Sequence, residues 1–193
     1  MCWILSLMIE CYYCDESIVN GMTQLYRDVE ATGKGIRPGT VGQNKVREDY
    51  KKCSDLFFNE IPDTGVTYSP AYRDMDYLDH VFTAIKNYSE LYLYDEPLEF
   101  FSAPKFQFYK PGEAFFADHF DALGPEQGRV VAFITYLNTV TDGGGTHFVW
   151  QDQTVDAVAG KTVLFPAGYT HRHKGVVSPT QEKLIITGWF KWK

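Results

Sequence analysis

Apolar residues recur at helical spacing in two segments of the N-terminal half. Over about 17–31 an apolar side chain returns every three or four positions, Asp15 can cap the start, and Gly33 follows the end. A second pattern of this kind begins at Pro70, and proline is favoured in the first turn of a helix. The sequence therefore predicts two amphipathic helices.

A short apolar run, Cys2–Ile9, precedes the first helix and is stopped by Glu10. A membrane-spanning helix needs about 20 apolar residues, so this run is too short for one. It also lacks the basic start of a signal peptide. We therefore expect a first β-strand here, and neither a membrane segment nor a leader.

The pattern changes near residue 98. Short runs rich in Phe, Tyr, Val and Ile alternate with turn clusters rich in Gly, Pro and Asp, which is typical of an antiparallel sandwich or barrel. We expect an α+β, mainly β, fold in one domain over 1–193, with helical support over about 1–97 and a β core over about 98–193. The predicted strands lie near 104–109, 114–120, 129–138, 146–150, 161–165, 169–175 and 182–191.

Composition narrows the function classes. A chain of 193 residues fits one domain, and 45% hydrophobic residues with 22% charged residues indicate a folded protein. The net charge of -7 weighs against a nucleic-acid-binding surface. Cys11 and Cys14 form a CxxC pair without a second pair nearby to complete a zinc site. Ordinary thiols in a reducing cytoplasm are the simpler interpretation.

Histidine and aspartate side chains form the first candidate site. His119 and Asp121 lie two apart in a predicted strand, so their side chains point the same way. With a second histidine they would make the facial triad that binds Fe(II) and leaves coordination positions open. His171 and His173, again two apart, are the candidates for that third ligand. A structural imidazole is the alternative for each.

Lys183 is the second candidate. The strand predicted around it is apolar on both faces, which indicates burial. A buried ammonium needs an anionic partner, and a small dicarboxylate would supply one.

These pieces together resemble the iron(II)- and 2-oxoglutarate-dependent dioxygenases of the prolyl 4-hydroxylase type. The resemblance covers about 104–190, in the order of the family's motifs, whereas residues 1 to about 100 match only in general character. The matching pieces are Tyr109–Gly112, His119–Asp121, Tyr136–Asn138, Gly143–Phe148, Gly160–Phe165, His173–Gly175, Lys183 and Thr187–Trp189.

The resemblance implies a double-stranded β-helix, which is a jelly-roll core, with N-terminal supporting helices. It implies that His119, Asp121 and His173 bind iron. The carboxylate of Asp121 favours hydroxylation, because relatives that halogenate lack it.

The resemblance also implies the co-substrate site. Lys183 would hold the distal carboxylate of 2-oxoglutarate, and the Thr135 hydroxyl would assist it. Tyr109 and Trp189 would line the pocket.

Three histidines remain outside this assignment. We favour His173 over His171 as the ligand because it stands ten residues before Lys183, and His171 would then pack or orient substrate. His147 replaces a usually apolar residue of the family and is expected to be structural or pocket-lining. We expect His80, on the second helix, to be solvated.

The implied reaction uses Fe(II), 2-oxoglutarate and O2, and it gives succinate, CO2 and a hydroxylated C–H bond. The substrate would be a peptide or a small molecule, with peptidyl proline as the first candidate. The oligomeric state stays open. Two other classes also stay open: a non-catalytic cupin-like module that binds small molecules, and a structural β-sandwich of a viral particle.

Overall fold

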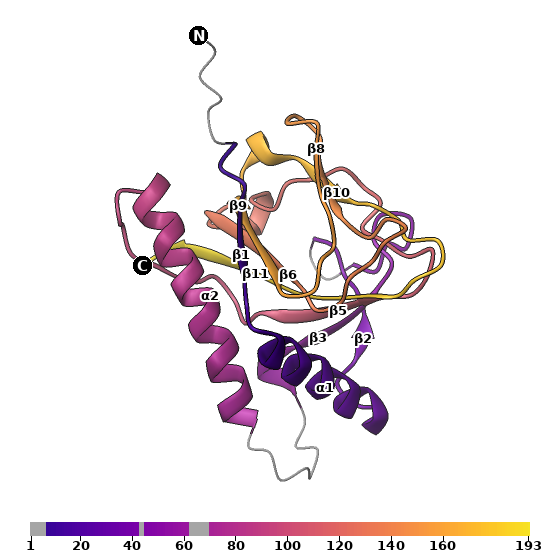
Figure 1. Ribbon diagram of the computed structural model, residues 1–193. Coiled ribbons are helices and arrows are strands. Elements are labelled where there is room, and N and C mark those ends of the chain that lie inside the picture. Colours follow the sequence, from indigo (N-terminus) through magenta and orange to yellow (C-terminus); the bar gives the residue numbers. More distant parts are fainter. Residues whose placement is uncertain (1–6, 43–44, 62–69) are drawn as a thin grey trace.

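The computed structural model describes residues 7–42, 45–61 and 70–193. Helices α1 (Glu16–Thr32) and α2 (Pro70–Tyr92) lie on one side of a large sheet, and a small sheet lies on the other side (Figure 1). Both predicted helices are confirmed. Gly33, in the left-handed region at φ 66°, ends α1 as expected from its freedom to adopt positive φ.

All strand pairings are antiparallel and form two sheets. The large sheet has the order β1-β9-β6-β11-β5-β3-β2, with β4 also paired to β11, and the small sheet has the order β10-β7-β8. The α+β, mainly β, class is confirmed. The strands are β1 (Glu10–Tyr13), β2 (Arg37–Pro38), β3 (Ser54–Phe57), β4 (Leu98–Phe100), β5 (Lys105–Tyr109), β6 (Val131–Tyr136), β7 (Thr146–Phe148), β8 (Gln153–Val155), β9 (Lys161–Pro166), β10 (His173–Gly175) and β11 (Lys183–Trp192).

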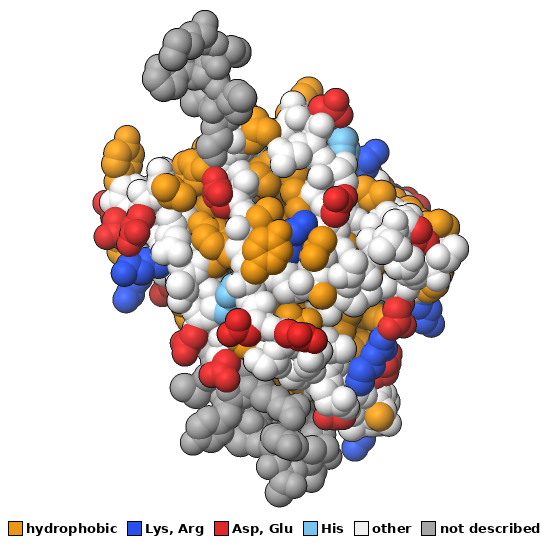
Figure 2. Space-filling view, viewed as in Figure 1, with side chains coloured by type: hydrophobic (Ala, Val, Ile, Leu, Met, Phe, Trp, Pro, Cys, Tyr) orange, Lys and Arg blue, Asp and Glu red, His pale blue; other side chains and the backbone are white. Residues whose placement is uncertain are grey.

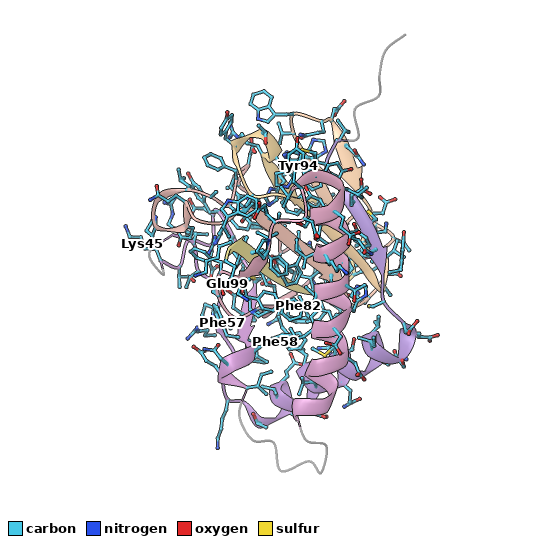
Figure 3. All side chains as sticks on the ribbon, turned by 90° about the vertical axis from the view of Figure 1, so that its left-hand side faces the viewer. Lys45, Phe57, Phe58, Phe82, Tyr94 and Glu99 are labelled. Carbon is cyan, nitrogen blue, oxygen red and sulfur yellow. The ribbon has the colours of Figure 1, made fainter. Side chains whose placement is uncertain are left out.

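The two helices cover one face of the large sheet, and α2 runs across it (Figure 3). The Phe82 ring of α2 lies 5.0 Å from that of Phe100, and Phe58 lies 5.1 Å from Phe106, between ring centroids. Apolar helix residues and every second residue of the central strands form one buried cluster there. The opposite face of the sheet is therefore left to face the small sheet.

Two predicted strands differ from the structure. Residues 114–120 form two isolated bridges, Lys51 with Phe115 and His119 with His173. Further backbone hydrogen bonds join the segment to Tyr50, Lys52 and Gly175, but they do not build a continuous ladder. The segment 169–175 starts as a 3-10 turn, Tyr169–His171, and only then enters β10.

The N-terminal strand is also shifted. Residues 2–6 of the expected strand Cys2–Ile9 lie outside the described residues, and 7–9 are not strand. The strand is β1, beginning at Glu10, where the chain pairs with Leu164 of β9.

Acidic and basic side chains are interspersed on the face of the molecule shown in Figure 2, among apolar ones. In the part of the chain that the structure describes, neither helix has the length and hydropathy needed to cross a bilayer.

Candidate functional site

A cavity of about 530 Å³ lies between the two sheets. Alternate residues of β11 line it, from Lys183 through Ile185 and Thr187 to Trp189. Alternation follows from the strand itself, because residues two apart point to the same face. The adjacent strand β5 adds residues of the same phase, and β7 and β10 of the small sheet close the other side.

His119, Asp121 and His173 come together at this cavity. One ligand atom from each lies within 4.8 Å of the other two. His173 Nε2 lies 3.7 Å from one Asp121 oxygen, and His119 Nε2 lies 4.0 Å from the other. The backbones of the two histidines form a bridge, with N–H to O distances of 3.0 and 2.8 Å, which sets the rings side by side.

Backbone carbonyls fix both imidazole tautomers. His119 Nδ1 lies 3.0 Å from the Ala117 carbonyl, and His173 Nδ1 lies 2.9 Å from the His171 carbonyl. A carbonyl only accepts, so each Nδ1–H donates and each Nε2 keeps its lone pair toward Asp121. The ring of His119 also stacks on Phe115, with centroids 3.6 Å apart.

The charge state suits metal binding. Burial lowers the pKa of His119 to about 4, and the nearby His173 lowers it further. The carboxylate of Asp121 raises this pKa, but its effect is smaller. The His119 imidazole is therefore neutral at pH 7, the form that binds a metal. Two imidazoles, each held by a carbonyl behind it, and one carboxylate are the donor set that non-haem Fe(II) requires. The residues fit the ion.

Lys183 is buried in the same cavity, with 5% of its surface exposed. Its Nζ donates to the Gly144 carbonyl at 2.9 Å and lies 4.4 Å from the centroid of the Tyr109 ring. Among the described residues no carboxylate forms an ion pair with it. Burial lowers its pKa to about 8. An ammonium has three N–H donors, so two remain for an anion.

The other predicted pocket residues divide. Tyr109 and Trp189 line the cavity. The prediction for Thr135 is wrong, because this residue lies on the opposite face of β6. Its hydroxyl is hydrogen-bonded to Tyr77 of α2 and to Thr162, at 2.8 Å each. The residue before it, Ile134, faces the cavity instead.

Two features escaped the sequence reasoning. Thr146, on β7, lines the cavity with its hydroxyl 2.7 Å from that of Tyr136. Lys105 also lines it, and its Nζ donates to Asp55 of β3 at 2.7 Å. Lys105 could have been found from the sequence, because it lies four residues before Tyr109 in the predicted strand 104–109 and therefore faces the same side. No sequence pattern pointed to its partner Asp55 on β3.

The remaining histidines lie outside the triad. His171 is hydrogen-bonded through Nε2 to the Leu7 carbonyl, at 2.8 Å. His147 does not line the cavity, and its Nδ1 lies 3.0 Å from the Thr154 hydroxyl. The prediction for His80 is wrong: it is half-buried, with Nε2 2.9 Å from the hydroxyl of Thr162.

Comparisons with known proteins agree with this site. The family model of the 2OG-Fe(II) oxygenase superfamily matches residues 104–191. No curated protein sequence matches the chain. The resemblance to 2-oxoglutarate- and Fe(II)-dependent oxygenases is confirmed, and it implies Fe(II), 2-oxoglutarate and O2 as the reagents.

Several solved structures share the fold. A prolyl-4-hydroxylase of Pseudomonas putida has a TM-score of 0.70 at 20% identity, over 96% of this chain and 92% of that one. A Trichoplax adhaerens prolyl hydroxylase was solved in complex with a peptide of the hypoxia-inducible factor oxygen degradation domain. It has a TM-score of 0.78 at 14% identity, over 96% of this chain and 84% of that one. A viral collagen prolyl hydroxylase of Paramecium Bursaria Chlorella virus-1, solved with 2OG, has a TM-score of 0.69 at 14% identity, over 96% of this chain and 97% of that one. The double-stranded β-helix is therefore confirmed.

Proposed function

We propose that this 2OG-Fe(II) oxygenase hydroxylates a prolyl residue in a peptide. The observation that carries the proposal is one cavity that holds both the His119, Asp121 and His173 cluster and the buried ammonium of Lys183. A cupin-like module that only binds a ligand would need neither the carboxylate of Asp121 nor an internal lysine, so that alternative is not favoured.

The protein's own residues bind and orient. His119 and His173 would hold the iron through Nε2, and Asp121 would supply the one anionic ligand. Lys183 would bind the distal carboxylate of 2-oxoglutarate with the two N–H groups that Gly144 leaves free. Iron and 2-oxoglutarate, when bound, supply the oxidising chemistry that converts 2-oxoglutarate and O2 to succinate and CO2 and hydroxylates a C–H bond.

Apolar walls keep water from the reaction. Ile185 and Phe165 line the cavity, and Phe165 packs edge-on against His173 with centroids 4.8 Å apart. Such walls strengthen the charge interactions inside and limit side reactions.

The peptide as substrate is supported by the neighbours that are prolyl hydroxylases, one of which is in complex with a peptide. We further propose that residues 1–193 act as one domain, since the helices and the sheet share one apolar cluster. A cytoplasmic location is supported by Cys11, Cys14 and Cys53, which are free thiols.

The test combines metal binding with product analysis. Anaerobic addition of Fe(II) and 2-oxoglutarate should develop the charge-transfer band of the chelate. In air, an amidated peptide of alternating Ala and Pro should gain one oxygen atom per succinate formed, located on proline by fragmentation. Absence of the band would reject the oxygenase site. A band with succinate but no oxidised peptide in a proline-rich set would reject the prolyl substrate.

A further inference from the structure

A second buried ammonium, that of Lys105, lies in the cavity apart from Lys183. Lys105 is 6% exposed, and its Nζ donates to Asp55 Oδ2 at 2.7 Å. Asp55 is 1% exposed and also accepts from Lys51, at 3.1 and 3.2 Å, and from Gln107 at 3.0 Å. One carboxylate thus serves two lysines.

The two lysines differ in how far the protein satisfies them. Lys51 Nζ has three acceptors, namely both oxygens of Asp55 and, at 3.5 Å, the Thr40 carbonyl. Lys105 Nζ has one acceptor among the described residues, the Asp55 oxygen. Since an ammonium carries three donors, Lys105 keeps two for a ligand, the same number as Lys183.

Aromatic rings frame these free donors. Lys105 Nζ lies 5.0 Å from the ring centroid of Phe57 and 5.8 Å from that of Trp189, and both residues line the cavity. The same two rings also contact guanidinium groups, Arg37 over Phe57 at 4.7 Å and Arg129 over Trp189 at 3.8 Å. Aromatic walls with a few placed charged groups are typical of a ligand site. Arg47, which also lines the cavity, is paired with Asp49.

The charges at this end do not balance. Lys51 and Lys105 together exceed Asp55 by one positive charge. Lys183 and the iron would be matched by Asp121 and the two carboxylates of 2-oxoglutarate. Of the remaining lining residues, Arg129 lies in the field of Asp121 first and of Glu126 second, which matches it in number of charges. A buried surplus charge is costly until a counter-ion arrives. Burial lowers the pKa of Lys105 to about 8, as does Lys51, whereas Asp55 opposes both.

Lys105 and Lys183 stand at different places along the sheet. In the β5–β11 ladder Lys105 stands opposite Thr187, and Tyr109 stands opposite Lys183. Four residues along a strand correspond to about 13 Å, which exceeds the length of a five-carbon dicarboxylate. The Nζ of Lys105 contacts Asp55, and the Nζ of Lys183 contacts the Gly144 carbonyl, so the two lysines are placed to bind different groups.

We propose that Lys105 binds a carboxylate of the substrate, so that the enzyme selects peptides with a carboxylate close to the target proline. This rests on the proposed prolyl hydroxylation. The carboxylate can belong to an acidic side chain or to a C-terminus; in both cases the recognised chemistry is a planar anion that accepts two N–H groups.

The test uses matched peptides on the anaerobic enzyme loaded with Fe(II) and 2-oxoglutarate, so that binding is measured without turnover. The pairs are acetyl-Ala-Pro-Asp-amide with its Asn analogue, acetyl-Asp-Pro-Ala-amide with its Asn analogue, and acetyl-Ala-Ala-Pro as free acid and as amide. At least one acid should bind about tenfold or more tightly than its neutral partner, and the pair that does so identifies the source of the carboxylate.

The variant Lys105→Met should reduce that ratio to less than about twofold without changing the Kd for 2-oxoglutarate. Lys191→Met is the matched control. Lys191 lies on β11, the strand that also carries Lys183, but it points outward and forms an ion pair with Glu99 of β4. This control should keep the full ratio. A thermal melt of each variant, together with the charge-transfer band, shows that the cavity is intact.

The outcomes separate the two proposals. Acid selectivity that depends on Lys105, without hydroxylation in air, supports the carboxylate site and rejects the prolyl reaction. Hydroxylation with equal affinity for acid and neutral peptides, or selectivity that survives in Lys105→Met, overturns the carboxylate site and leaves the prolyl reaction standing. Failure of every peptide to bind overturns both. If Lys105→Met does not fold, Lys105→Gln replaces it under the same criteria.

Discussion

The two faces of the large sheet are built from the same strands but differ in chemistry. On β11 the residues Leu184, Ile186 and Phe190 face the helices and pack into an apolar cluster. The alternate residues, from Lys183 to Trp189, face the cavity. Burial of each large apolar side chain contributes about 1.5–3 kcal/mol, whereas a buried ammonium opposes folding. The helix face therefore stabilises the fold that holds a costly, reactive face in place.

The difference explains why the polar residues of the two faces are handled differently. On the helix face Thr135, Tyr77 and Thr162 satisfy one another within the protein. On the cavity face Lys183 and Lys105 keep donors that have no acceptor among the residues that the structure describes. Self-satisfied polar groups indicate structure, and buried groups with donors to spare indicate a ligand.

The largest expected effect is at the metal cluster. Asp121→Ala should reduce succinate formation by more than about 100-fold, because the loss of a supporting contact alone costs 10–100-fold at metal sites and here the anionic ligand itself is removed. The measurement is succinate release with excess iron. His171→Ala is the control and should keep the charge-transfer band, since its ring lies outside the cluster. Wild-type succinate release by Asp121→Ala would refute the ligand assignment.

Next in size is the co-substrate anchor. Lys183→Ala should raise the KM for 2-oxoglutarate at least tenfold, from the loss of a charge-assisted contact of about 1.4 kcal/mol or more. Iron affinity should change little. An unchanged KM would mean that another group of the cavity binds the distal carboxylate.

A smaller effect is expected from pH. The pKa of Lys183 is lowered to about 8, so the free enzyme loses this charge as pH rises above 8. The carboxylate binds the protonated form, so the KM for 2-oxoglutarate should rise about twofold between pH 7 and 8 and approach about a tenfold rise per unit above that. Initial rates at several pH values measure this, and Lys183→Ala should flatten the rise. A KM that falls with pH would contradict the assignment.

The smallest effect on activity is expected on the helix face. Thr135→Val should lower the free energy of unfolding by about 1–3 kcal/mol, because the buried hydroxyls of Tyr77 and Thr162 lose a partner. The KM for 2-oxoglutarate should not change. Denaturant unfolding and initial rates measure the two quantities. A raised KM with unchanged stability would return Thr135 to the co-substrate site.

The sequence predicted the candidate site better than it predicted the chain path around it. His119, Asp121, His173 and Lys183 could be selected because strand spacing and motif order are local properties. The prediction of a strand over 114–120 was wrong. Whether a segment pairs continuously or only at isolated bridges depends on partners such as Lys51, which are distant in sequence. The prediction for Thr135 was wrong because neighbouring positions of a strand point to opposite faces of the sheet. Which face meets the helices and which meets the cavity depends on where α2 packs.

The sequence by itself determined the two helices, the strand-rich second half and the order of its chemical groups, since hydrophobic period and turn residues act over a few positions. The tertiary structure alone decided which partner each buried charge has. Asp55 and Lys105 are 50 positions apart, and Lys183 reaches the Gly144 carbonyl across 39. Such pairs form only when strands from both halves lie in one sheet or face one cavity, and the number of donors left free at Lys105 and Lys183 follows from that arrangement.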